Sequence, residues 1–125
     1  MRFPTLLFLS IAMVGIASTE LNAAIMNFGL TGLPLTNEDY SLMEEAVQPL
    51  LTDTSLPIGT ERAWSNPRSG NRGTVKLLQR FEAEHEGNKL PCRKIEYDAQ
   101  IRNSSNPYRF LLNRCQVPDG RWKIL

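Results

Sequence analysis

Two cysteines, Cys92 and Cys115, bound the stretch that decides the fold, CRKIEYDAQIRNSSNPYRFLLNRC. Its centre at 103–107, NSSNP, is rich in residues that favour turns. If the two halves pair as an antiparallel hairpin with the cysteines opposite each other, this turn falls at the midpoint. The same register places apolar residues opposite one another on one face: Ile95 with Leu112, Tyr97 with Phe110, and Ala99 with Tyr108. A slip by one residue would move every side chain to the other face, so the register is strongly specified.

The other face of this hairpin pairs Asp98 with Arg109 and carries both cysteines. Cross-strand pairs of these kinds stabilise a sheet by roughly 0.2–1 kcal/mol each. If the chain is exported to an oxidising compartment, an even pair of cysteines predicts a structural disulfide bond between Cys92 and Cys115, worth roughly 3 kcal/mol in the chain-entropy description. Two buried free thiols are the alternative.

Runs of strand-forming residues separated by turn residues extend outward from the hairpin. We expect Val75, Leu77 and Phe81 to join the face of Ile95 and Tyr97. The fold class is therefore α+β, with an N-terminal helix packed on a four- to five-stranded antiparallel β-meander. The expected strands are Thr60–Asn66, Thr74–Glu84, Leu90–Arg102, Tyr108–Val117 and Arg121–Leu125.

A single amphipathic helix is expected before the strands. Thr36 is a candidate N-cap, and acids follow it in the first turn, where the helix dipole favours them. Apolar residues then recur at spacings of three and four, and Pro49 is expected to end or kink the helix near Val47 or Gln48. The chain thus divides into a lead-in, helix and linker over 24–59 and an antiparallel β domain over 60–125.

The first 23 residues are typical of a secretory signal peptide. Arg2 is followed by an apolar run from Leu6 to Ala17, about a dozen residues where a bilayer needs roughly 20. We expect cleavage after Ala23, with cleavage after Ala17 as the alternative. A retained anchor or a buried helix are the other interpretations. No cysteine lies near either cleavage site, so the sequence predicts no lipid anchor of the lipobox type.

Charge is distributed unevenly along the chain, although the net charge is only +1. Residues 24–61 carry six acids and no Lys or Arg, whereas 62–125 carry 13 Lys and Arg against six acids. Such a basic half can attract an anionic surface. Alternatively, the acidic helix packs beside the basic sheet and neutralises it, which is the interpretation we favour.

No catalytic, cofactor-binding or metal-binding constellation stands out. His85 is alone near a turn, and Glu82, Glu84 and Glu86 alternate so that they would share one face of a strand. We interpret both as solvated strand-end residues. Trp64 and Trp122 are expected to fill the core, with stacking platforms for a ligand as the alternative. The basic residues lack the interleaved aromatics of a nucleic-acid-binding surface.

Four motifs in the basic half follow one another in a familiar order. Residues 64–75 read WSNPRSGNRGTV, Cys92-Arg93 follows, then Cys115, and Asp119-Gly120-Arg121-Trp122 closes the series. This order resembles the C-terminal domain of the bacterial surface-antigen family typified by the rickettsial 17 kDa surface antigen, over about Thr36 to Leu125. The resemblance implies an exported cell-envelope protein of Gram-negative bacteria without established catalysis. Because this chain lacks a lipobox cysteine, we expect the periplasm, with the outer membrane or cell surface as the alternative.

These observations predict a non-catalytic, surface-antigen-like envelope protein that binds or organises an anionic envelope component. The candidate binding surface comprises Arg68, Arg72, Trp64 and Trp122. The alternative is a periplasmic protein-binding partner or inhibitor that acts through the 66–73 loop. No cofactor, metal or nucleic-acid partner is expected, and the sequence leaves membrane association and oligomeric state open.

Overall fold

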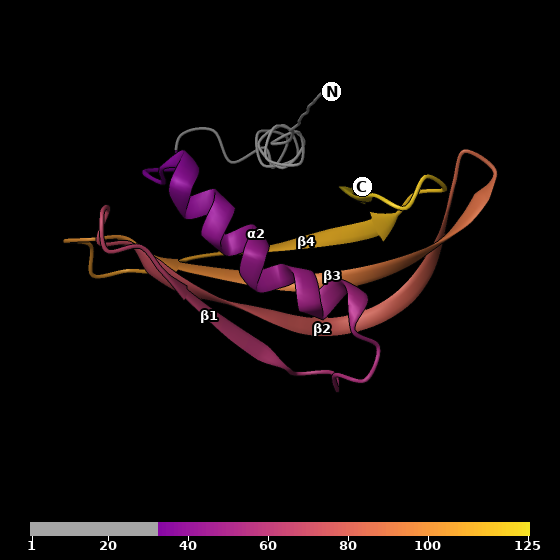
Figure 1. The fold of residues 1–125 in the computed structure, drawn as a ribbon, viewed down its shortest axis with the longest axis horizontal. Coiled ribbons are helices and arrows are strands. Elements are labelled where there is room, and N and C mark those ends of the chain that lie inside the picture. The colour runs from indigo at the N-terminus through magenta and orange to yellow at the C-terminus, as the bar shows by residue number, and fades with distance from the viewer. Residues whose placement is uncertain (1–32) are drawn as a thin grey trace, which may run out of the picture.

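The computed structural model describes residues 33–125; the predicted signal peptide, 1–23, and the start of the lead-in segment lie outside them. One helix, α2 (Asn37–Thr52), packs on one face of a five-stranded antiparallel sheet (Figure 1). The strands lie side by side in chain order, which confirms the predicted helix on an antiparallel meander. Their bounds are β1 Glu61–Ser65, β2 Arg72–His85, β3 Asn88–Gln100, β4 Tyr108–Gln116 and β5 Trp122–Ile124.

Helix α2 begins with the predicted cap. The Thr36 hydroxyl accepts the backbone N–H of Asp39 at 3.0 Å, and the Asp39 carboxylate accepts the backbone N–H of Thr36 at 2.8 Å. This reciprocal pair is a capping box, with aspartate in the position usually held by glutamate.

Of the two predicted effects of Pro49, an end or a kink of the helix, the end is wrong, because α2 continues to Thr52. Proline lacks an N–H, so the carbonyl of Glu45 loses its helical partner, but Glu45 is exposed and water can replace that bond. Leu50 and Leu51 are buried in the core and hold the last turn in place. The backbone N–H of Asp53 then closes the helix on the Pro49 carbonyl at 2.9 Å.

The register of β3 against β4 is the one that the cysteines predicted. Cys92 lies opposite Cys115, and the two form a disulfide bond. Tyr97 lies opposite Phe110, and their rings stack with centroids 5.0 Å apart. The predicted pairs Ile95–Leu112, Ala99–Tyr108 and Asp98–Arg109 are also confirmed.

A β-bulge in β2 changes the predicted face of Phe81. Leu77 lies opposite Ile95 as expected, but Gln79 lies opposite Lys94, so Leu78 is an extra residue. Beyond it the side-chain alternation is inverted. Phe81 therefore lies opposite Cys92, on the face away from α2, and its predicted place beside Ile95 and Tyr97 is wrong. There it joins a small second cluster comprising Leu90, Cys92, Cys115, Ala83 and Val117.

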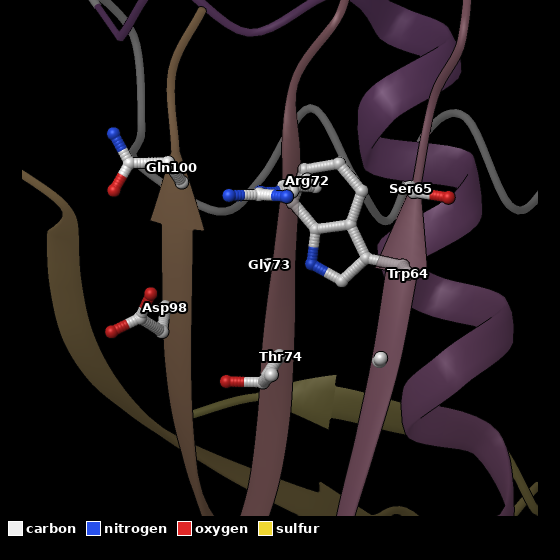
Figure 2. A pocket seen from close by; sticks show the side chains of 8 residues that line it. Trp64, Ser65, Arg72, Gly73, Thr74, Asp98 and Gln100 are labelled. Carbon is white, nitrogen blue, oxygen red and sulfur yellow. The ribbon is translucent and has the colours of Figure 1, made fainter. Parts of the chain in front are cut away.

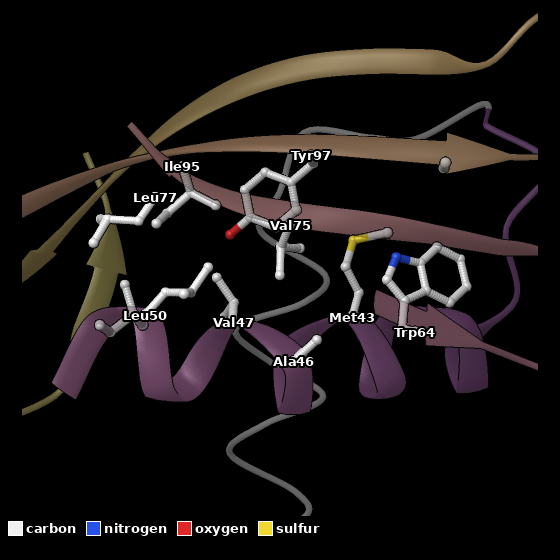
Figure 3. Close-up of a cluster of buried hydrophobic side chains, with 11 residues drawn as sticks. Met43, Ala46, Val47, Leu50, Trp64, Val75, Leu77, Ile95 and Tyr97 are labelled. Atoms are coloured by element: carbon white, nitrogen blue, oxygen red, sulfur yellow. The ribbon is translucent and has the colours of Figure 1, made fainter. Parts of the chain in front are cut away.

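The main core lies between α2 and the central strands (Figure 3). Met43, Val47 and Leu50 point from the helix toward the sheet and are fully buried. Burial of this apolar stripe, at roughly 25 cal/mol per Å², holds the helix on the sheet. The strand side chains that meet it are Trp64, Val75, Leu77, Ile95, Tyr97 and Ala99. Among residues 33–125, no helix is long and apolar enough to cross a membrane.

Candidate binding surface

The loop between β1 and β2 is tied to the helix by one buried carboxylate. Asp39 Oδ1 accepts hydrogen bonds from Asn66 Nδ2 and from the Ser69 hydroxyl, both at 2.7 Å. Its Oδ2 accepts from Asn71 Nδ2 at 2.8 Å and from the backbone N–H of Thr36. Asp39 is fully buried, yet its two oxygens receive four hydrogen bonds. The loop is thus anchored to the first turn of α2.

These bonds also set the ionisation of Asp39. Burial, the largest single effect, would raise the pKa of its carboxyl group, but the bonds from Ser69, Thr36, Asn71 and Asn66 together lower it below the ordinary 3.8. The carboxylate is therefore charged at neutral pH. Asn66, Ser69 and Asn71 of the 64–75 motif thus serve to hold the loop.

Sequence reasoning missed this role of Asp39. The spacing of Thr36 and Asp39 indicates only a helix cap, and the loop residues indicate only a turn. Asn66 and Asn71 are almost completely buried, a burial that no local pattern in a Gly- and Pro-rich segment predicts. A long-range contact between the helix start and this loop was needed to find it.

The face of the sheet opposite α2, here called the open face, carries the candidate surface. By strand alternation it presents Arg72 and Lys76 of β2 and Lys94, Glu96 and Asp98 of β3. A shallow groove of about 460 Å³ lies at one end of this face (Figure 2). Its lining comprises Ala63, Trp64, Ser65, Arg72, Gly73, Thr74, Asp98 and Gln100.

The structure brings together some of the predicted surface residues and separates others. Arg72 and Trp64 both line the groove, and Arg68 projects from the adjoining loop with 84% of its side chain exposed. Trp64 is nevertheless a core residue, only 5% exposed and packed over Gly73. Trp122 lies on β5, at the opposite edge of the sheet from β1, and its ring packs under the guanidinium of Arg93 at 5.1 Å. The four residues therefore do not form one continuous site.

Two acids of the acidic segment are used inside the fold rather than on its surface. Glu44 of α2 forms a buried, bidentate ion pair with Arg114 of β4, with N–O distances of 3.0 and 2.9 Å. Burial alone would lower the pKa of Arg114, but the bonds to Glu44 help to raise it. Arg114 also donates to the Tyr97 hydroxyl, whose pKa burial raises to about 12. With Asp39 also internal, the helix partly neutralises the sheet from within.

Most basic residues of the sheet half have no carboxylate partner. Of the 13 Lys and Arg residues in 62–125, only Arg68, Arg109, Arg114 and Arg121 form ion pairs with acids in the described chain. The Arg68 pair is long, at 3.9 Å, and exposed. The other nine cations of this half therefore form no salt bridge with an acid of residues 33–125.

The strand end near His85 offers no built site. His85 Nε2 lies 3.9 Å from a Glu86 oxygen, and both side chains are exposed. The expectation that Glu82, Glu84 and Glu86 share one face is wrong, because Glu86 leaves the strand at the hairpin turn with φ of 50°. In the part of the chain that the structure describes, no cluster of His, Cys, Asp and Glu could hold a metal ion.

No family model, no curated protein and no solved structure matches this chain. The surface-antigen resemblance therefore stays a prediction, and the residues themselves carry the functional argument.

Proposed function

We propose that this protein is an exported, non-catalytic cell-envelope module that binds an anionic envelope component through the open face of its sheet. The observation that carries the proposal is that Arg72, Lys76 and Lys94, on the open face, form no ion pair with an acid within residues 33–125. If these basic residues served only to neutralise the acidic helix, we would expect them to form ion pairs with its acids. Free cations on an extended face are suited to a phosphorylated or carboxylated polymer or lipid.

Three basic residues of the open face form the centre of the proposed binding surface. Arg72, Lys76 and Lys94 lie on adjacent strands β2 and β3. Two acids of β3 lie on the same face: Asp98 is already paired with Arg109, at 2.7 Å, and so opposes an incoming anion less, and Glu96 lies opposite Lys76. A basic residue near an anionic membrane surface contributes about 1 kcal/mol, so three together give roughly a hundredfold in affinity at low salt.

The test is co-sedimentation of the chain with phosphatidylglycerol vesicles and with lipopolysaccharide, at low and at high salt. We expect binding that salt weakens and that the triple variant Arg72→Gln, Lys76→Gln, Lys94→Gln loses by roughly a hundredfold. A control with the same change of charge keeps the open face intact: Arg62→Gln, Lys89→Gln, Arg102→Gln. Absence of binding at low salt, or equal losses in both triple variants, would contradict the proposal.

The export part of the proposal has its own test. The disulfide bond between Cys92 and Cys115 weakly supports an oxidising compartment such as the periplasm. The test is the intact mass of the native protein from separated periplasmic and membrane fractions. We expect a periplasmic species whose mass corresponds to the chain without residues 1–23 and increases by about 2 Da on reduction. A full-length species in the membrane fraction would argue for a retained anchor.

A second candidate function is a protein-binding partner or inhibitor acting through the 66–73 loop. It is favoured by the Asp39 network, which fixes the loop in advance and so lowers the entropic cost of binding. Arg68 is the exposed side chain that such a loop would present. A photo-crosslinking residue at position 68 should then capture one discrete envelope protein, whereas the same residue at position 119, in an exposed turn, should not. A diffuse or identical pattern at both positions would count against this function.

A further inference from the structure

Three arginines lie side by side across the sheet, on the face that carries the helix. Arg80 of β2 lies opposite Arg93 of β3, and Arg93 lies opposite Arg114 of β4. This row crosses β2 and β3 near the C-terminal end of α2, beyond which both strands continue past the helix (Figure 1). The bulge at Leu78 creates the row, because it turns Arg80 to the helix side.

Only one of these three arginines forms a salt bridge with an acid of residues 33–125. Arg114 is held by both oxygens of Glu44 and by the Tyr97 hydroxyl. Arg93, which is 8% exposed, donates one bond, from Nη1 to the carbonyl of Cys92 at 2.9 Å. Within residues 33–125, neither Arg80 nor Arg93 forms a salt bridge with an acid, although the charge of Arg80 helps to lower the pKa of the exposed Asp53 carboxyl group.

The Arg80 and Arg93 guanidinium groups also have unused donors. The Nε atoms of both residues are buried and have no hydrogen-bond acceptor within the described chain. Arg80 uses Nη2 to bind the carbonyls of Leu56 and Asp53, at 2.6 and 3.3 Å. Burial, and then the positive charge of Arg80, lower the pKa of Arg93. Two like charges in directly opposed positions destabilise a sheet, and a buried unpaired charge adds to that cost.

We propose that Arg80 and Arg93 form a binding site for a phosphate-type oxyanion, which bridges the two guanidinium groups. A tetrahedral oxyanion has several acceptor oxygens and a charge that can offset both cations, and arginine forks match this geometry. The Trp122 ring, 5.1 Å below the Arg93 guanidinium, holds that group in place. Arg80 is only partly buried, so an anion can approach the pair from its side.

This site is distinct from the open face, because Arg80 and Arg93 lie on the side of the sheet that carries α2. It therefore goes beyond the proposed function, and either can fail without the other. The oxyanion can be free phosphate or the phosphate of an envelope lipid headgroup.

The experiment is a titration of the whole chain with inorganic phosphate at constant ionic strength, followed by the arginine Nε–H resonances. We expect saturable shifts for Arg80 and Arg93, and little shift for Arg114, whose two Nη groups Glu44 already holds. Arg80→Gln should weaken phosphate binding about tenfold or more, because it removes charge-assisted bonds. Arg62→Gln, an exposed arginine of the edge strand β1, is the matched control and should leave binding unchanged.

A charge-preserving variant and a second titration complete the experiment. Arg93→Lys preserves charge if Arg93→Gln fails to fold, and it should weaken phosphate binding because a lysine lacks the guanidinium fork. Titration with phosphatidylglycerol vesicles separates the two sources: shifts of the same resonances indicate a lipid phosphate, and shifts with inorganic phosphate alone indicate free phosphate. Non-saturable shifts in both titrations, or equal effects of Arg80→Gln and Arg62→Gln, overturn the site.

Discussion

Replacing Asp39 with asparagine should detach the 66–71 loop from the start of helix α2. Each carboxylate oxygen of Asp39 now faces two donors: Asn66 and Ser69 on one side, Asn71 and the Thr36 N–H on the other. An asparagine amide turns one of these two acceptors into a donor. Two hydrogen bonds to a charged group are therefore lost whichever way the amide points, and each contributes about 1.5–3 kcal/mol. We expect a loss of at least about 3 kcal/mol in the free energy of unfolding.

The assay is urea unfolding of wild type and Asp39→Asn, at neutral pH and in acid. The pKa of Asp39 is lowered in the folded state, so its stabilisation is fully present above the ordinary value of 3.8 and is lost as the pH falls through the lower folded value. The difference between the two proteins should therefore shrink in acid.

The matched control is Glu38→Gln in the same helical turn, whose carboxylate is exposed and 3.9 Å from Arg68. It should cost about 1 kcal/mol or less. If Asp39→Asn is no more costly than the control at neutral pH, or if its cost does not change in acid, the anchoring role of Asp39 is refuted.

Three further changes test the core of the fold by thermal and urea unfolding. Glu44→Gln should cost about 3–5 kcal/mol, because Arg114 is left buried without its acid, and adding Arg114→Met should restore much of the loss. No recovery in that double variant would contradict this explanation. Gly73→Ala should destabilise by about 1–3 kcal/mol or more, because its Cβ would collide with a backbone carbonyl of β3; wild-type stability would show that the strands can separate there. Replacing Cys92 and Cys115 with alanine should cost about 3 kcal/mol, and an unchanged urea midpoint would contradict that estimate.

The hairpin of β3 and β4 could be predicted from the sequence because several signals agreed on one register. The cysteines, the apolar pairs and the turn residues all depend on the same side-chain alternation, so a wrong register would have broken all of them at once. The helix end at Pro49 and the face of Phe81 were mispredicted because tertiary packing and a β-bulge overrode the local sequence rules. Burial of Leu50 and Leu51 carries the helix past the proline, and an extra residue at Leu78 inverts the alternation before Phe81.

The candidate sites were harder to predict than the fold. Arg72 and Arg68 could be singled out because they lie in a loop motif, but the row formed by Arg80, Arg93 and Arg114 depends on the bulge. Nothing in the sequence marks an extra residue at Leu78, so the alternation alone places Arg80 on the wrong face.

The most direct test of the account is a map of backbone amide shifts as the chain is titrated with lipopolysaccharide at low salt. Binding through the open face predicts saturable shifts that gather on the amides around Arg72, Lys76 and Lys94 and that disappear at high salt. The central claim would be contradicted by amides on the open face that do not move, whether binding is absent or confined to α2 and the 66–71 loop.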